Sequence, residues 1–203
     1  MIRMTNFSLD PNSHEGDTAA KIVFALERLS HLFRIHWWEE NKNFQLSPLQ
    51  MQLLITLRFQ PQLNSVSALA DYLELTRATV SDAAQTLNQK GYLLKRADAA
   101  DGRRHKLALT AAGLETAEAL AQFADRVRDL VQTLPQPGFF LENLLQLMQQ
   151  LQASGFIPLQ PMCTSCRHFR RTPDAASPYY CQLLDQPLRA HELRIHCPEH
   201  EAP

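Results

Sequence analysis

The first strong pattern along the chain is an apolar stripe at three- and four-residue steps, which is typical of one face of an α-helix. The stripe consists of Ile22, Leu26, Leu29, Phe33 and Trp37. It predicts a helix that begins at Asp17. The preceding residues, 1–16, are polar and mixed in character and include a proline and a glycine, so they predict a flexible arm.

A second helix is predicted to begin at the tetrapeptide Ser47-Pro48-Leu49-Gln50. Serine caps a helix, proline suits the first helical position, and glutamine three residues after the serine closes a capping box. The leucines that follow supply a core face. Pro61 then ends the helix.

Two short helices joined by a tight connection come next. The first is predicted over Ser67–Leu73, and the connection is Glu74-Leu75. The second helix is predicted to be capped by Thr76 and to end at Gly91. Two short helices so closely joined form a helix-turn-helix.

A β-hairpin is predicted directly after this helix pair. Residues 92–96 and 105–109 form its strands, and the polar turn over 98–104 contains Asp101-Gly102, a strong hairpin signal. Thr110 is predicted to cap a long helix toward Leu134, and a leucine- and glutamine-rich helix follows at about 139–153.

This order of elements predicts a mainly α fold with a small β-hairpin wing, that is, a winged helix-turn-helix followed by a small cysteine-rich metal-binding extension. The predicted divisions are the arm over 1–16, the winged helix-turn-helix with its dimerisation helices over 17–155, and the cysteine-rich segment over 156–203.

In such a module the second helix presents its N-terminal side chains to base edges in the major groove, and the first helix braces it against the backbone. The candidate DNA-binding residues are Ser67, Thr76, Arg77, Thr79, Val80, Ser81 and Gln85, with Arg103 and Arg104 at the hairpin tip. Hydroxyls and guanidinium groups suit phosphates and base edges, and Val80 suits a thymine methyl. The hairpin arginines suit phosphates or the minor groove. A helix-turn-helix that binds proteins is the alternative interpretation.

Several stretches of the chain resemble the MarR family of bacterial regulators. The stretches are Leu46-Ser-Pro-Leu-Gln, Ala68-Leu-Ala-Asp-Tyr-Leu-Glu-Leu-Thr-Arg-Ala-Thr-Val-Ser, Gly91-Tyr-Leu-Leu-Lys-Arg, Asp101-Gly-Arg-Arg and Leu107-Ala-Leu-Thr-Ala-Ala-Gly. The resemblance covers roughly residues 18–153. It implies a homodimer joined through its N- and C-terminal helices, with the recognition helices in successive major grooves of a pseudo-palindromic operator in double-stranded DNA.

The composition indicates the cellular compartment in which the protein is expected. The chain has 203 residues, 45% of them hydrophobic and 20% charged, as in ordinary soluble globular proteins. Its net charge of −1 means that any basic surface has to be local. No apolar run approaches the roughly 18 residues of a membrane span, and residues 1–10 lack a signal-peptide core. We therefore expect a cytoplasmic protein with no membrane partner, in a compartment where disulfides are rare.

All four cysteines fall in the last 41 residues. They are Cys163, Cys166, Cys181 and Cys197, with the spacing C-x2-C-x14-C-x15-C. Clustered thiols in a reducing compartment indicate metal binding before disulfides. Structural zinc usually has two close cysteine pairs, whereas this segment has one pair and two single cysteines, an arrangement that a cubane cluster tolerates well.

The segment Cys163-Thr-Ser-Cys-Arg-His-Phe, with Tyr180-Cys-Gln-Leu-Leu and Cys197 after it, is similar to high-potential iron–sulfur proteins. The similarity covers about 35 residues and implies a [4Fe–4S] cluster held by the four cysteines. Two alternatives stay open. A structural zinc ion would use the same thiolates, with His168, His196 or His200 able to replace one, and free thiols would act as a redox switch.

The sequence thus predicts a transcription regulator, expected to be a repressor, whose activity is modulated by a [4Fe–4S] cluster. Recognition helices must stand about 34 Å apart, so a change at the cluster would alter DNA binding through the dimer geometry. No phosphate loop, nucleophile elbow or zinc-protease motif is present, so we expect no enzyme. The alternative functions are a MarR-type sensor of small molecules with a structural zinc site and an iron–sulfur electron-transfer component.

Overall fold

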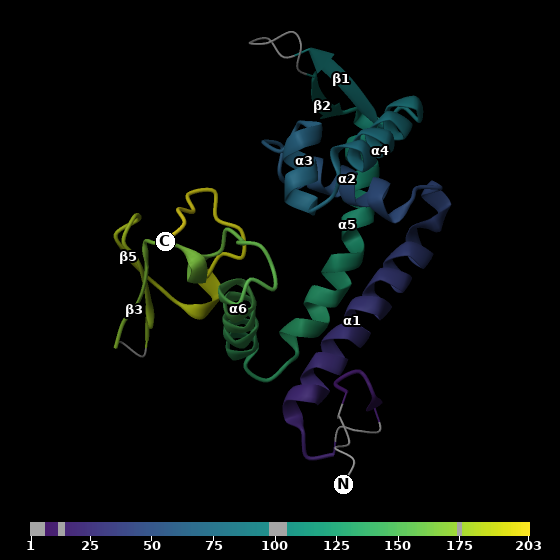
Figure 1. The fold of residues 1–203 in the computed structure, drawn as a ribbon. Coiled ribbons are helices and arrows are strands. Elements are labelled where there is room, and N and C mark those ends of the chain that lie inside the picture. The colour runs from purple at the N-terminus through teal and green to yellow at the C-terminus, as the bar shows by residue number, and fades with distance from the viewer. Residues whose placement is uncertain (1–6, 12–14, 98–104, 174–175) are drawn as a thin grey trace. The chain divides into compact units, whose positions relative to one another are not determined.

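The computed structural model describes residues 7–11, 15–97, 105–173 and 176–203. By their internal contacts these residues divide into two compact units, Met1–Arg126 and Val127–Pro203 (Figure 1). Each unit has a hydrophobic core of its own.

Among its described residues, the regular structure of the first unit is helical apart from one hairpin. Its elements in chain order are α1 (Thr18–Asn41), the 3-10 helix η2 (Lys42–Phe44), α2 (Pro48–Phe59), α3 (Val66–Leu73), α4 (Arg77–Gln89), β1 (Leu93–Ala97), β2 (His105–Leu109) and most of α5 (Ala111–Gln132). The strands pair antiparallel, from Leu93 opposite Leu109 to Ala97 opposite His105. Figure 1 shows the hairpin beside α3 and α4. The predicted mainly helical fold with a small antiparallel sheet is confirmed.

Helix starts agree with the predicted caps. The Ser47 and Gln50 side chains form the capping box of α2, and Asp17 caps α1. The helix-turn-helix is also present, and Thr76 caps its second helix as predicted. Its first helix begins earlier than predicted, because Ser65 caps it. Ser67 therefore lies inside α3 rather than at its start.

The core of the first unit lies where α2, α3, α4 and the hairpin meet. Its fully buried side chains include Met51, Leu53, Leu54, Leu69, Val80, Leu87, Leu93 and Leu120. Because these residues come from α2, α3, α4, β1 and α5, one core joins the helix-turn-helix to the wing and to α5.

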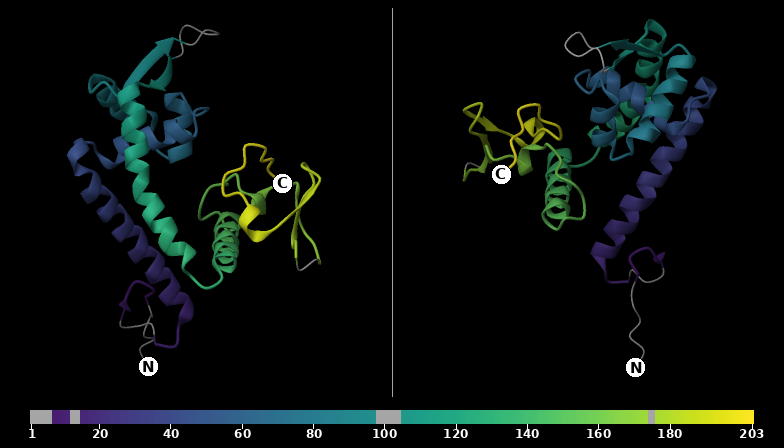
Figure 2. Two further views of the ribbon diagram at one scale, coloured as in Figure 1. Left: turned by 180° about the vertical axis from the view of Figure 1, so that it is seen from behind. Right: turned by 45° about the horizontal axis from the view of Figure 1, so that its top comes forward.

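Helices α1 and α5 lie side by side in Figure 1 and in the left view of Figure 2. The Trp37 indole donates a hydrogen bond of 3.1 Å to the Leu120 carbonyl, and the rings of Phe33 and Phe123 meet edge to face at 4.7 Å. Trp37 packs against the core, but the N-terminal part of the α1 stripe stays uncovered. Ile22 is 51% exposed and Leu29 is 62% exposed.

The second unit joins one helix to a small sheet. Its elements after the end of α5 are α6 (Pro137–Ala153), the 3-10 helix η3 (Cys163–Ser165), β3 (Phe169–Arg171), β4 (Tyr179–Cys181), β5 (Gln186–Leu188) and the 3-10 helix η4 (Ala190–Glu192). The strands are antiparallel in the order β3-β4-β5.

The core of the second unit joins α6 to the cysteine segment. Leu145 of α6 is buried together with Met162, Tyr179, Leu188 and Leu193. By internal contacts the chain divides between residues 126 and 127, inside α5, whereas the sequence predicts a division after residue 155. The physical reason is that α6 buries one of its apolar faces against the cysteine segment. In the part of the chain that the structure describes, no helix is long and apolar enough to cross a membrane.

Candidate nucleic-acid interface and candidate metal centre

The N-terminus of α4 is exposed and held in a fixed conformation. The Thr76 hydroxyl accepts a hydrogen bond from the Thr79 backbone N–H at 3.2 Å and lies 2.8 Å from the Thr79 hydroxyl. Arg77 follows the cap, and its side chain is exposed. The free N–H groups and dipole of a helix N-terminus favour anions, so this end of α4 suits a phosphate or a base acceptor.

The remaining candidate residues of α4 differ in exposure because they lie on different faces of the helix. Gln85 is exposed and Ser81 is half-buried, so both are open to a ligand to some degree. Val80 is 0% exposed and belongs to the core, so in this structure its side chain does not reach the surface where a thymine methyl would bind. The reason is periodicity: Val80 shares one helix face with the buried Ala83 and Leu87.

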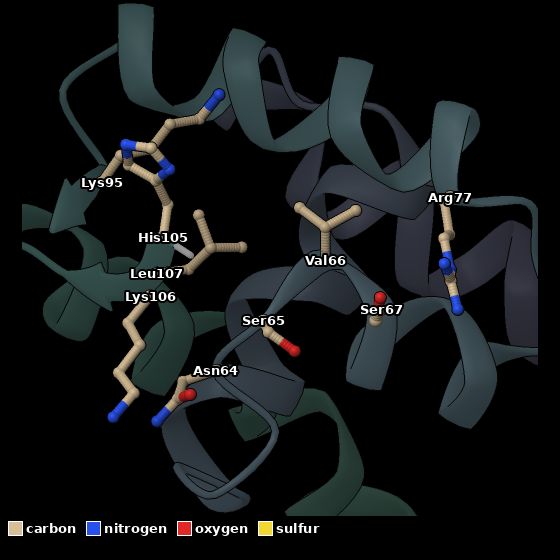
Figure 3. A pocket seen from close by; sticks show the side chains of 9 residues that line it. All are labelled: Asn64, Ser65, Val66, Ser67, Arg77, Lys95, His105, Lys106 and Leu107. Atoms are coloured by element: carbon tan, nitrogen blue, oxygen red, sulfur yellow. The ribbon is translucent and has the colours of Figure 1, made fainter. Parts of the chain in front are cut away.

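A hollow of about 860 Å³ lies between the helix-turn-helix and the hairpin (Figure 3). Its lining residues are Asn64, Ser65, Val66, Ser67, Arg77, Lys95, His105, Lys106 and Leu107. The hairpin is tied to the start of α3 by a 2.7 Å hydrogen bond from the Leu107 N–H to the Asn64 carbonyl. This bond holds the strands that form one side of the hollow.

The hollow is electropositive. Arg77 from α4 and Lys95 and Lys106 from the strands line it, and none of the described residues in its lining is acidic. Ser67 and Asn64 add neutral polar groups. Such a surface suits the phosphate backbone of a nucleic acid, which cations and hydroxyls bind without regard to sequence.

Sequence reasoning found Ser67 and Arg77 but missed Lys95, His105 and Lys106. The available signal was the pairing of basic residues within the predicted strands, Lys95-Arg96 and His105-Lys106. The predicted contacts of Arg103 and Arg104 lie outside the described residues.

In the second unit all four cysteines line one small pocket. Cys163 and Cys166 lie at the two ends of the η3 turn, Cys181 ends β4, and Cys197 follows η4. Their thiols are free of disulfides and partly accessible. The apolar side chains that line the same pocket are Phe169, Leu183, Leu184 and Leu188.

Backbone hydrogen bonds join the segment around Cys163 to the segment around Cys197. The Cys163 N–H donates to the Arg194 carbonyl at 2.9 Å, and the Cys197 N–H donates to the Pro161 carbonyl at 2.7 Å. Burial raises the pKa of the Cys163 thiol, the Arg194 N–H opposes that rise, and the neighbouring Cys197 and Cys181 thiols add to it.

Two nearby histidines have other partners. His168 also lines the pocket, but its Nε2 lies 3.2 Å from a Glu201 carboxylate oxygen, and this contact lowers the pKa of Glu201. The His200 ring lies 3.0 Å from both the hydroxyl and the carbonyl of Ser165. Among the described residues, no group of three or more His, Cys, Asp or Glu side chains is arranged to hold a single metal ion.

Comparison with known proteins bears on the first unit. Residues 44–104, which include α2, both helices of the helix-turn-helix and β1, match the model of the MarR family. No curated protein matches the chain.

The solved structures that resemble the chain include several of MepR from Staphylococcus aureus. MepR, a transcription regulator of the multidrug efflux pump MepA, is 24% identical with a TM-score of 0.53, over 64% of this chain and 98% of that one. A single-residue mutant of MepR is 25% identical with a TM-score of 0.54, again over 64% and 98%. A MepR–DNA complex is 24% identical with a TM-score of 0.57, over 64% and 96%. These likenesses support the winged-helix fold, and the predicted iron–sulfur resemblance of the cysteine segment stays a prediction.

Proposed function

We propose that this chain is a transcription regulator, a repressor, that binds double-stranded DNA as a homodimer. The observation that carries the proposal is the electropositive hollow beside the exposed N-terminus of α4. In a winged helix the DNA backbone passes between the recognition helix and the wing, and Arg77, Lys95 and Lys106 lie on the two sides of such a channel. The match to the MarR family and the likeness to a protein solved with DNA support the same interpretation.

Within this proposal the residues divide by task. Thr76, Arg77 and Thr79 present hydrogen-bonding groups from the first turn of α4, where base edges are read. Ser67, Lys95 and Lys106 bind phosphates and orient the module on the duplex. Because phosphate contacts carry no sequence information, specificity rests on the first group.

Removal of the cations of the hollow tests this assignment. Arg77→Ala, and separately Lys95→Ala with Lys106→Ala, should weaken operator binding by about tenfold or more, since a charged hydrogen bond contributes about 1.5–3 kcal/mol. Each lost phosphate contact should also lower the log–log salt slope by about one unit. Fluorescence anisotropy at several salt concentrations measures both effects.

The matched control is Lys42→Ala, an exposed cation of η2 that pairs with Glu39 and does not line the hollow. It should leave affinity and slope unchanged. If all variants bind DNA as the wild type does, the interface lies elsewhere.

The homodimer is supported by the uncovered stripe of α1, because large apolar patches on a soluble protein mark interaction surfaces. Leu29→Glu, which puts a charge into the stripe, should weaken dimerisation by at least tenfold, or about 1.4 kcal/mol. The neighbouring Arg28→Glu lies off the stripe and should leave the dimer intact. Analytical ultracentrifugation at micromolar concentration decides, and a monomeric wild-type chain would contradict the proposal.

We further propose that a [4Fe–4S] cluster, held by Cys163, Cys166, Cys181 and Cys197, modulates DNA binding. The support is that all four cysteines line one pocket together with apolar side chains. When bound, such a cluster supplies one-electron redox chemistry and a charge that changes with its state. The protein's own contribution is to supply the thiolates, shield them with Phe169 and Leu188, and join them to the core that contains α6.

The absorption spectrum and metal content of anaerobically purified protein test the cluster. A brown protein with iron and acid-labile sulfide supports it. A colourless protein with zinc would leave the cysteines as a structural staple, and the regulatory part of the proposal would fail while DNA binding stands.

A further inference from the structure

Arg194 contacts two of the four candidate thiolate ligands. Its backbone N–H donates to the Cys163 sulfur at 3.2 Å, and its guanidinium Nη1 lies 3.8 Å from the Cys197 sulfur, within range of an N–H···S hydrogen bond. Cys163 and Cys197 are the first and last thiols of the set, so one residue reaches both ends of the cysteine segment.

The position of Arg194 is fixed by its surroundings. Its carbonyl accepts the Cys163 N–H, so residues 163 and 194 bond to each other in both directions. The preceding Leu193 is buried in the core of the second unit. These contacts fix the backbone of residue 194, and from there the exposed guanidinium reaches the Cys197 sulfur.

The other arginines near the pocket have different partners. Arg167 pairs with Glu201 at 3.5 Å, Arg170 donates to the backbone carbonyls of residues 167 and 169, and Arg171 lies over the Tyr179 ring. Among the contacts found in the described residues, the guanidinium of Arg194 is therefore the one directed at a sulfur.

We propose that Arg194 is a positioning residue that raises the reduction potential of the cluster, an inference that rests on the proposed [4Fe–4S] site. A cluster with four thiolates is anionic, and one added electron increases its negative charge. A guanidinium is charged at every physiological pH, so Arg194 stabilises the reduced form more than the oxidised form. Its N–H groups act in the same direction, because hydrogen bonds to sulfur are among the determinants of cluster potential. One electron passes from an added reductant, dithionite, and no bond forms or breaks.

The test is a potentiometric titration of the full, anaerobically purified chain, followed by absorbance. Arg194→Gln should lower the midpoint potential, with the ratio of reduced to oxidised protein at a fixed potential falling several-fold to about tenfold, where tenfold equals about 59 mV for one electron. Arg194→Lys keeps the charge but not the planar guanidinium. Its midpoint potential should lie between those of the wild type and Arg194→Gln. Arg170→Gln, the matched control, should titrate as the wild type does.

Other outcomes are equally decisive. A loaded Arg194→Gln protein with an unchanged potential would overturn the inference. So would loss of iron from both Arg194 variants while Arg170→Gln stays loaded, since Arg194 would then be needed to assemble the site. Wild-type protein without iron and sulfide would overturn the cluster itself, and metal analysis identifies that failure before any potential is measured.

Discussion

Gly113→Ala is expected to destabilise the winged-helix unit by about 3 kcal/mol, the upper end for an overpacked core. A Cβ at this position would lie 2.1 Å from the carbonyl oxygen of Tyr92 and 3.2 Å from a methyl carbon of Leu109. The first of these atoms belongs to the backbone, so no side-chain rotation relieves the clash. Either α5 or the start of the wing must shift. Urea denaturation followed by circular dichroism measures the loss.

The matched control is Gly138→Ala in the first turn of α6. There a Cβ would meet its nearest neighbour, the Ala190 Cβ, at 3.5 Å, which is ordinary contact. Alanine favours a helix over glycine by up to about 1 kcal/mol, so this variant should be neutral or slightly more stable. Equal stability of the two variants would mean that α5 does not pack as closely on Tyr92 as the structure has it.

The surroundings of Gly113 illustrate what could be predicted from the sequence. Thr110 was predicted to cap α5, and its hydroxyl does accept the Gly113 N–H at 3.0 Å. The same hydroxyl donates to the Gly91 carbonyl at 2.7 Å, and the Thr110 N–H donates to the Tyr92 carbonyl at 3.0 Å. These bonds join the end of α4 to the start of α5. A cap is a local signal, whereas the need for glycine at 113 arises from a carbonyl 21 positions earlier in the chain.

Elements with strong local signals were predicted well. The helix start at Asp17, the caps at Ser47 and Thr76 and the hairpin strands agree with the structure to within a residue or so. The sheet of the second unit was not predicted, because its strands are three residues each and too short for an alternating pattern.

The candidate nucleic-acid interface was predicted in part, for a similar reason. Position along α4 indicated Thr76 and Arg77, but the role of Lys95 and Lys106 depends on how the hairpin lies against α3. That placement follows from a tertiary hydrogen bond between Leu107 and Asn64, which no sequence periodicity reports. The burial of Val80 was not predicted, because its neighbours in sequence are polar while its neighbours in space form the core.

Cys181→Ser is expected to remove most of the bound metal, because a hard hydroxyl is a poor substitute for a soft thiolate. Cys181 ends the central strand β4, opposite Phe169 and Gln186, and serine fits the same space, so the sheet should persist. The winged-helix unit should keep its helicity, since its core contains no residue of the cysteine segment. Iron, sulfide and zinc analysis measures the loss, with circular dichroism in parallel. Tyr180→Phe, one residue away, removes only a hydrogen bond to Asp185 and should load normally.

The same Cys181→Ser variant decides whether the metal regulates DNA binding. Coupling between two sites typically amounts to about 1–3 kcal/mol, or about 5- to 150-fold in affinity. Apo protein and Cys181→Ser should therefore bind operator alike and differ from the loaded protein by a factor in that range. The titration uses loaded wild type, apo wild type, Cys181→Ser and loaded Tyr180→Phe under anaerobic conditions at one salt concentration. Tyr180→Phe should follow the loaded wild type. If all four bind with equal affinity, the cysteine site is a structural staple or an electron carrier, and the winged-helix unit binds DNA independently of it.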